Sequence, residues 1–321
     1  MTTGLWDHET FIANLREVGG HAYHDKHPFH VAMNEGRLSP EALRGWVANR
    51  FYYQRNIPVK DAAILSNCPQ REVRRIWIHR VIDHDGSVEN EGGIEAWLRL
   101  GEACKLSHHE LIQDRYVQPG VRFAVDAYVN FARTQPWPVA IASSLTELFA
   151  PDLMAARLAA FEKFYTWIDR AGLDYFRRRV TQARHDSEEA LAITLEHCNT
   201  PELQRDAIRA LEFKCDVLWS MLDAIHHAYG TPIADEAQPR LARGVRLQID
   251  CTTGKGVLLF PEGILELNET AHEILTRCDG RTLSELVRAL ADDYDVDVSA
   301  LAADVRETLA DLQRRKLVEF A

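Results

Sequence analysis

The stretch Ser39–Arg55, which reads SPEALRGWVANRFYYQR, places a cation inside an apolar helical face. Its apolar residues recur with the period of an α-helix, and Ser39-Pro40-Glu41 is typical of a helix start. One face of this helix reads Leu43, Trp46, Val47, Arg50, Phe51 and Gln54. Arg50 and Gln54 therefore interrupt a stripe that is otherwise expected to be buried.

Cations interrupt four further helical faces in the same way. They are Arg80 among Val73, Ile76, Trp77, Val81 and His84; Arg157 among Leu153, Phe161, Phe164 and Ile168; Arg179 one turn after Tyr175; and Lys214 between Leu211 and Leu218. Any one of them can pair with a carboxylate on a neighbouring helix or extend its charged end to solvent. Inward-facing carboxylates are scarcer on these stripes, and Glu147 is the clearest of them.

The excess of cations predicts an anionic ligand. An unpaired buried charge costs several kcal/mol, so the missing negative charge is expected to come from a bound molecule. Because the planar guanidinium group binds a carboxylate with two parallel hydrogen bonds, several arginines around one cavity favour a small polycarboxylate. His24 and His84 are expected near these cations, which lower the proton affinity of an imidazole and leave it available as a neutral base.

Composition limits the class of protein. The chain has 321 residues and a net charge of −11, which argues against a general nucleic-acid binder. Its six cysteines are far apart and include no Cys-x-x-Cys pair, as expected for reduced thiols. The N-terminus lacks a basic segment followed by an apolar run, and no stretch approaches membrane-spanning length. These features predict a cytoplasmic enzyme with no membrane association.

The pattern changes once along the chain. Residues 1–230 are almost wholly helical in period, with about seven helices, a further start signal at Ser187-Glu188-Glu189, and breaks at Pro28, Pro69, Pro119, Pro136 and Gly172. Residues 231–239 form a polar, proline-bounded linker. Residues 240–321 show strand-like runs at 245–249, 256–260 and 317–320 and three short helices, a winged-helix-like α+β layout. This segment has 11 basic and 15 acidic residues, a net charge of −4, so we expect it to bind protein or peptide rather than DNA.

Signals for a cofactor are weak. The chain has 14 histidines, but a di-iron bundle needs two Glu-x-x-His motifs and only Glu269-Thr-Ala-His272 has that spacing. This motif is interpreted as a surface helix turn in the acidic segment, and no metal site is predicted. The sequence has neither a glycine-rich phosphate loop nor a Rossmann fingerprint, and no nucleophilic serine elbow.

Longer motifs carry a family resemblance. Residues 45–54 (GWVANRFYYQ), 56–58 (NIP), 60–64 (KDAAI), 83–86 (DHDG), 143–151 (SSLTELFAP) and 213–224 (FKCDVLWSMLDA) resemble the pyrroloquinoline quinone (PQQ) synthases, PqqC. The tail, with Phe260-Pro-Glu-Gly263, Leu267-Asn268, Thr270-Ala271, Cys278-Asp-Gly280 and Thr282, resembles PqqD, a small peptide-binding protein of the same pathway. Together the two resemblances imply a natural fusion of PqqC and PqqD.

The resemblance implies a fold and a reaction. PqqC proteins are homodimeric, haem-oxygenase-like helical bundles that work without haem, metal or flavin. They close the last ring of a tricarboxylate quinoline precursor (AHQQ) and remove eight electrons with dioxygen, releasing PQQ and hydrogen peroxide. The tail would bind the precursor peptide PqqA and the radical SAM enzyme of the pathway.

The resemblance also assigns residues. It implies catalytic roles near oxygen for His84, Tyr175 and Arg179, with His24 as an additional catalytic group. It implies substrate binding by Tyr23, Arg50, Tyr53, Gln54, Lys60, Arg80, Tyr128, Thr146, Glu147, Arg157 and Lys214. Met154 departs from the family pattern, in which an active-site histidine precedes Arg157. Either that histidine is dispensable, or a group such as His24 compensates, or the rate of peroxide and product release is altered.

Two other readings use the same bundle. A TenA-like hydrolase would need a well-placed catalytic cysteine, and Cys215, beside Lys214, is the one cysteine next to a cation stripe. A haem oxygenase would need a proximal histidine early in the chain. A non-enzymatic scaffold that only carries peptide or intermediates is the second alternative.

Overall fold

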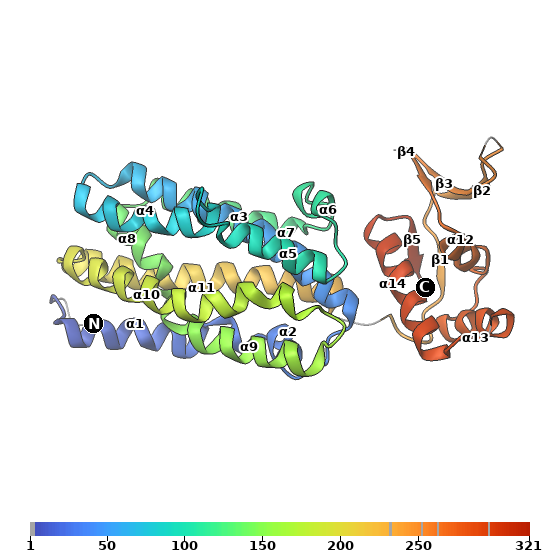
Figure 1. Cartoon of the computed structure of the whole chain (residues 1–321), viewed down its shortest axis with the longest axis horizontal. Coiled ribbons are helices and arrows are strands. Elements are labelled where there is room, and N and C mark those ends of the chain that lie inside the picture. Colours follow the sequence, from blue (N-terminus) through green and yellow to red (C-terminus); the bar gives the residue numbers. More distant parts are fainter. Residues whose placement is uncertain (1–3, 231–232, 252, 262, 295) are drawn as a thin grey trace. The chain divides into compact units, whose positions relative to one another are not determined.

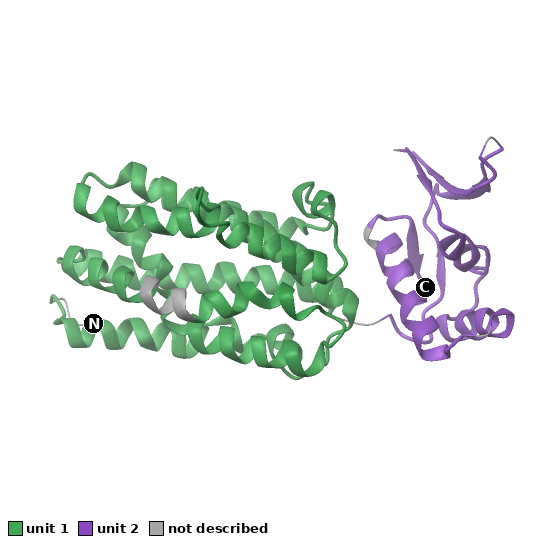
Figure 2. Cartoon of the chain, in the orientation of Figure 1, with its two compact units in different colours: residues 1–230 green, residues 231–321 purple. Residues whose placement is uncertain are grey.

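The computed structural model describes residues 4–230, 233–251, 253–261, 263–294 and 296–321, without the side chains of residues 181–186 and 314. The chain divides into two compact units, Met1–Gly230 (unit 1) and Thr231–Ala321 (unit 2), shown in Figure 2. Each unit has a hydrophobic core of its own, so each is described by itself.

Unit 1 is helical (Figure 1). Its α-helices are α1 (His8–Ala22), α2 (Pro28–Asn34), α3 (Pro40–Asn67), α4 (Arg71–Asp85), α5 (Gly92–Ala103), α6 (His108–Ile112), α7 (Pro119–Thr134), α8 (Trp137–Ala142), α9 (Ala150–Phe164), α10 (Asp174–His197) and α11 (Pro201–Tyr229). Three 3₁₀ segments join them: η1 (His24–Lys26), η2 (Ser143–Phe149) and η3 (Arg170–Leu173). The described residues thus form more helical segments than the seven expected, because several short helices lie between the long ones.

Two details of the helix prediction are wrong. Ser187-Glu188-Glu189 does not start a helix, since it lies inside the continuous α10. Helix α9 ends at Phe164, whose side chain is 42% exposed. Ile168 lies in the loop that follows this helix. Both errors concern helix boundaries, which local sequence signals place least reliably.

The long helices pack side by side around an aromatic core. Helix α3 packs against α4, α5 and α7, while α10 packs against α9, and α11 against α1 and α7. Figure 1 shows α3–α5 along one side of the bundle, α1 and α9 along the other, and α10 and α11 between them. The ring of Trp46 lies 5.5 Å from that of Trp97 and 6.2 Å from that of Phe161. The predicted apolar stripe of α3 is therefore confirmed as core.

Helix α3 carries five of the pocket residues described below, and its sequence explains its course. The Ser39 hydroxyl accepts a hydrogen bond from the Ala42 amide at 3.1 Å, and Pro40 occupies the first turn, where its missing N–H costs nothing. Pro58 lies inside the helix and has no N–H to donate to the carbonyl of Gln54. The helix therefore lacks one internal hydrogen bond, in the turn between Gln54 and Pro58.

One stretch, Trp137–Phe164, is long and apolar enough to cross a membrane by length and composition, contrary to the expectation from sequence. It is divided among α8, η2 and α9, and 61% of its apolar 18-residue window is buried inside the structure. Its apolar residues serve as core: Ala140, Ile141, Ala142 and Leu145 are fully buried.

Unit 2 combines short strands and helices. They are β1 (Pro239–Leu241), β2 (Arg246–Ile249), β3 (Gly256–Phe260), β4 (Gly263–Glu266), α12 (Glu269–Thr276), α13 (Leu283–Asp293), α14 (Val298–Arg314) and β5 (Val318–Phe320). Strands β2, β3 and β4 form an antiparallel sheet with Leu247 opposite Leu258, and β1 pairs with β5. The predicted hairpin, three helices and last strand are confirmed, whereas β1 and β4 were not predicted.

Residues 233–239, expected as a linker, are bonded into unit 2. The Leu283 amide donates to the Ala237 carbonyl at 2.8 Å, and the Ser284 amide donates to the Asp235 carbonyl at 3.0 Å. Residues 231 and 232 lie outside the described residues. In α12, Glu269 of the Glu-x-x-His motif is exposed on the first turn.

Candidate active site

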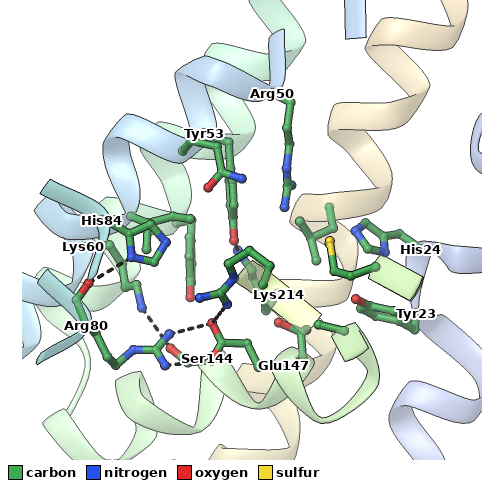
Figure 3. A pocket seen from close by; sticks show the side chains of 18 of the residues that line it. Tyr23, His24, Arg50, Tyr53, Lys60, Arg80, His84, Ser144, Glu147 and Lys214 are labelled. Carbon is green, nitrogen blue, oxygen red and sulfur yellow. Dashed lines mark hydrogen bonds and ion pairs between the residues drawn. The ribbon is translucent and has the colours of Figure 1, made fainter. Parts of the chain in front are cut away.

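A pocket inside unit 1 collects polar side chains from distant parts of the sequence (Figure 3). Its walls come from α3, α4, α7, α9, α10, α11, η2 and the turn at Tyr23 and His24. It is lined by Tyr23, His24, Arg50, Tyr53, Gln54, Ile57, Lys60, Arg80, His84, Tyr128, Ser144, Thr146, Glu147, Ala150, Met154, Tyr175, Arg179, Lys214 and Leu218. Every residue to which the sequence assigned a site role is among them except Arg157.

Glu147 holds two of the buried arginines. Arg80 donates from both terminal nitrogens to the two oxygens of Glu147, each at 2.7 Å, and Arg179 lies 3.5 Å from the same carboxylate. Burial alone would raise the pKa of Glu147, but the charge of Arg80 outweighs it and lowers the pKa to about 2. Glu147 is therefore ionised at neutral pH and fixes the orientation of both guanidinium groups.

Asp61 is a second internal counterion, and the sequence analysis missed it. This fully buried carboxylate accepts from Lys60 Nζ at 2.5 Å and from Trp77 Nε1 at 3.0 Å, and lies 3.6 Å from Arg80. Asp61 lies eleven residues, about three helical turns, after Arg50 and therefore shares its face, but that face was followed only as far as Gln54. Three of the pocket cations thus have partners within the protein.

Two pocket cations have no such partner. No carboxylate in the described part of the chain lies within ion-pair distance of Arg50 or Lys214. Lys214 donates to the Tyr53 hydroxyl at 2.6 Å, and its nitrogen lies 3.5 Å from the centre of the Tyr128 ring. Burial lowers the pKa of Lys214 well below its usual value, and the charges of Lys60 and Arg50 lower it further. A bound anion would supply the missing charge.

His84 is held in one orientation beside Arg179. Its Nδ1 lies 2.9 Å from the Arg80 carbonyl, which can only accept, so the proton of the neutral ring is on Nδ1. Burial and the charge of Arg179 lower the pKa of His84 to about 4. At neutral pH the Nε2 of this histidine therefore carries a free lone pair and can accept a proton.

Tyr175 lies between Gln54 and the aromatic core. The Gln54 amide nitrogen donates to the Tyr175 hydroxyl at 2.5 Å, and the Trp97 ring packs against the Tyr175 ring at 4.7 Å. Since the phenol oxygen accepts from Gln54, its own proton remains available to donate elsewhere. The opposite atom of Gln54, Oε1, is buried and has no hydrogen-bond partner among the described residues.

His24 and Met154 line the same pocket. His24 is 3% exposed, and its Nδ1 has no hydrogen-bond partner among the described residues. Burial, reinforced by the charges of Arg50 and Arg157, lowers the pKa of His24 well below its usual value. Met154 is buried and cannot donate or accept a proton, whereas the neutral imidazole of His24 in the same pocket can accept one.

Arg157 is buried but lies behind the pocket lining. It donates to His30 Nε2 at 3.1 Å and covers the ring of Trp46. His30 Nδ1 in turn lies 3.0 Å from the His24 carbonyl, which fixes His30 as a neutral ring with its proton on Nδ1. The sequence analysis assigned His30 no role. In the sequence, His24, His27 and His30 recur at every third position. Only the fold shows that His30 links Arg157 to His24.

The free space inside the pocket is about 50 Å³. Such a volume suits a few water molecules, whereas pockets for larger organic ligands are roughly 300–1,000 Å³. A tricyclic ligand would therefore require side chains or helices around the pocket to move apart.

Comparison with known proteins identifies the family. Residues 12–224, more than half of the chain, match the TENA/THI-4/PQQC family. The chain belongs to this family. Residues 255–318 match the family described as coenzyme PQQ synthesis protein D (PqqD).

Two curated relatives of this TENA/THI-4/PQQC protein define its two parts. It is 58% identical over 229 residues to a pyrroloquinoline-quinone synthase of Pseudomonas aeruginosa, covering 71% of this chain and 91% of the relative. It is 39% identical over 356 aligned positions to the bifunctional coenzyme PQQ synthesis protein C/D of Methylorubrum extorquens, covering 98% and 96%. The chain is thus a PqqC/PqqD fusion of PQQ biosynthesis, and unit 1 is an enzyme of the PQQ synthase type.

Solved structures agree on the fold. A TenA homologue from Pseudomonas syringae superimposes with a TM-score of 0.55 at 15% identity, covering 68% of this chain and 92% of that one. A domain with a heme oxygenase-like fold from Shewanella denitrificans gives 0.56 at 11% identity, covering 69% and 91%. The predicted haem-oxygenase-like bundle is confirmed.

Cys215, the cysteine considered for the TenA-like alternative, does not have the properties of a catalytic thiol. Cys215 is buried and does not line the pocket, and burial raises the pKa of its thiol to about 12. A thiol that stays protonated at neutral pH is a poor nucleophile. All six cysteines are free, as predicted. Among the described residues, no group of three or more His, Cys, Asp or Glu side chains is placed to hold a metal ion.

Proposed function

We propose that unit 1 closes the last ring of the tricarboxylate precursor AHQQ and oxidises it to PQQ with dioxygen, without a resident cofactor and with release of hydrogen peroxide. The observation that carries this proposal is the pair Arg50 and Lys214, half-buried and fully buried respectively, which line the pocket and lack a carboxylate partner in the described part of the chain. A tricarboxylate supplies the negative charges that these cations require.

Substrate binding is assigned to the cations and tyrosines of the pocket wall. Arg50 and Lys214 take substrate carboxylates directly, since a charge-assisted hydrogen bond between buried groups is the strongest kind available. Arg80 keeps its ion pair with Glu147 and orients that carboxylate. Lys60 keeps its ion pair with Asp61 and its hydrogen bond to Ser144. Tyr23, Tyr53, Tyr128 and Thr146 complete the binding surface. Arg157 acts from behind the lining, through His30 and His24.

Proton transfer is assigned to the wall that bears His84, Tyr175 and Arg179. His84 Nε2 takes a proton from the bound substrate, which makes it electron-rich enough to reduce dioxygen. The guanidinium group of Arg179 stabilises the reduced, anionic oxygen species, and the Tyr175 hydroxyl donates a proton to it. Dioxygen is the electron acceptor and the substrate is the electron donor.

His24 is proposed to serve where the family pattern has a histidine and this chain has Met154. The two side chains line one pocket, and His24 Nδ1 has no partner in the described structure. A substrate group hydrogen-bonded to that nitrogen would be protonated or deprotonated there.

Unit 2 is proposed to bind the precursor peptide PqqA and the radical SAM enzyme of the pathway. Its net charge of −4 over residues 240–321 supports a protein or peptide partner over nucleic acid. We further propose that the chain is a homodimer and acts in the cytoplasm, where its six free cysteines stay reduced.

Aerobic incubation of the purified chain with AHQQ tests the enzymatic proposal. Formation of PQQ and hydrogen peroxide by the wild type, retained after dialysis against a chelator, is the expected result. Turnover that is lost on dialysis and restored by iron or copper contradicts the cofactor-free part. A chain that binds AHQQ and PqqA but never forms PQQ under dioxygen would instead be a scaffold.

A further inference from the structure

A second, narrower cavity lies against the catalytic wall of the pocket. It shares His84, Tyr175 and Arg179 with the main pocket, and is completed by Asp83, Asn90, Gly92, Gly93, Ala96 and Arg178. The three shared residues are at most 8% exposed, whereas Asn90 and Arg178 lie at the surface. The cavity therefore runs from the outside of the bundle, beside the loop between α4 and α5, to the far side of the residues assigned to oxygen chemistry.

Its size restricts what can use it. The free space is about 10 Å³, close to the minimum of roughly 10–15 Å³ that a single water molecule requires. A molecule of two heavy atoms passes through it with small movements of the lining side chains, but an aromatic tricarboxylate does not. The main pocket offers only about 50 Å³ before any ligand enters, so a bound tricarboxylate would fill it and close the direct approach to His84.

Two consecutive glycines, Gly92 and Gly93, line the cavity and differ in how closely other atoms approach them. A Cβ on Gly92, which has φ +77°, would lie 2.4 Å from the Gly86 nitrogen and 2.6 Å from the His84 carbonyl oxygen. These glycines let the loop close directly behind His84. At Gly93 a Cβ would lie 3.5 Å from the Asp83 carbonyl oxygen and 3.7 Å from the Tyr175 ring, which is ordinary contact. Gly93 therefore leaves free the space that a side chain would take from the cavity.

We propose that this cavity is the passage by which dioxygen reaches His84, Tyr175 and Arg179, and by which hydrogen peroxide leaves, while the tricarboxylate occupies the main pocket. The inference rests on the proposed function, because it takes dioxygen to be the electron acceptor. It adds a route separate from that of the organic substrate, with Gly93 as the residue that keeps the route open.

Gly93→Ala and Gly93→Val test the passage in the full-length chain. Each variant is saturated anaerobically with AHQQ and mixed with buffers of increasing dioxygen concentration, which gives the second-order rate constant for dioxygen. Gly20→Val is the matched control, since a Cβ at Gly20, on the exposed side of α1, meets no atom within 4 Å. Near-ultraviolet circular dichroism verifies that each variant keeps the wild-type core.

We expect Gly93→Val to lower the second-order constant for dioxygen about tenfold, with a smaller decrease in Gly93→Ala, and to leave AHQQ affinity and the rate at high dioxygen unchanged. If the Gly93→Ala or Gly93→Val complex reacts with dioxygen as fast as the wild type, the proposed passage is wrong but the proposed function is unaffected. A lower rate at high dioxygen without a changed dioxygen dependence also contradicts the passage, because it would show displacement of Tyr175. A wild-type complex that does not react with dioxygen overturns the proposed function itself.

Discussion

Unit 1 buries charged side chains around a pocket, whereas unit 2 builds its interior from aliphatic ones. Among the described residues, every buried polar or charged side chain belongs to unit 1, including Lys60, Asp61, Arg80, Arg157 and Lys214. The core of unit 2 is formed by residues such as Leu258, Leu283, Leu286, Val305 and Leu309, all fully buried. Since burial of charge costs stability, the difference indicates that unit 1 carries chemistry inside and that unit 2 acts through its surface.

The largest expected effect is loss of the buried carboxylate at Asp61. Asp61→Ala leaves Lys60 without its ion-pair partner and Trp77 Nε1 without its acceptor, so we expect unit 1 to lose about 3–5 kcal/mol. All seven tryptophans precede residue 231, so their fluorescence in urea reports unfolding of unit 1 alone. Glu202→Ala, at an exposed ion pair with Arg205, is the control and should change stability far less than Asp61→Ala. Equal effects of the two substitutions would contradict the role of Asp61.

A core truncation in unit 2 sharpens the comparison. Leu286→Ala removes a fully buried side chain and should destabilise unit 2 by about 2–5 kcal/mol. The loss should be visible by circular dichroism, while tryptophan fluorescence reports an unchanged midpoint for unit 1. Val298→Ala, at a position 53% exposed in the same unit, serves as control. A shifted tryptophan midpoint in Leu286→Ala would show that the two units unfold together.

Lys214→Met separates stability from binding within unit 1. Methionine fills a similar volume without a buried charge, so unit 1 should become more stable, by about 1–3 kcal/mol. The same variant should bind AHQQ more weakly by about 1.5–3 kcal/mol, because a charge-assisted hydrogen bond is lost. Urea unfolding and anaerobic calorimetry measure the two quantities, and Lys163→Met, on the exposed surface of α9, is the control. A variant that is both less stable and unchanged in affinity would assign Lys214 to structure.

The buried histidines make unit 1 sensitive to acid. The pKa of His84 is about 4 in the folded chain and near 6.5 when unfolded, so between these values the unfolded chain binds a proton that the folded chain does not. Stability must therefore fall as the pH is lowered from 7 to 5, by about 2 kcal/mol for this one group. In His84→Gln the decrease between pH 7 and pH 5 should be smaller by that amount. An identical pH dependence of stability in wild type and variant would contradict the lowered pKa of His84 in the folded chain.

Sequence alone predicted the elements that periodicity controls. The stripe of α3, the hairpin of β2 and β3, and the meeting of Arg50, Arg80, Arg179 and Lys214 at one pocket all follow from which residues share a helical or strand face. The resemblance to PqqC and PqqD added the bundle type and the two-part organisation. Ile76, placed on the buried face of α4, is instead 37% exposed, since periodicity gives a direction but not the width of the covering layer.

The sequence alone did not predict which side chains pair with one another inside the pocket. Asp61 neutralises its neighbour Lys60 on α3 and Arg80 on α4, and His30 supports Arg157 across 127 residues of chain. Helical spacing places Asp61 on the face of Arg50, but which cations it pairs with depends on side-chain direction and on the packing of neighbouring helices. The displacement of Arg157 from the pocket lining has the same cause.

Anaerobic titration with AHQQ followed by admission of dioxygen in a stopped-flow spectrometer tests the central claim most directly. Arg50→Ala should bind AHQQ more weakly than the wild type, because a cation expected to hold a substrate carboxylate is gone. His84→Ala should bind AHQQ but oxidise it about 10²–10⁴-fold more slowly and accumulate a partly oxidised, quinol-like intermediate. If His84→Ala binds poorly yet oxidises what it binds at the wild-type rate, the pocket does not separate substrate binding from oxygen chemistry as proposed.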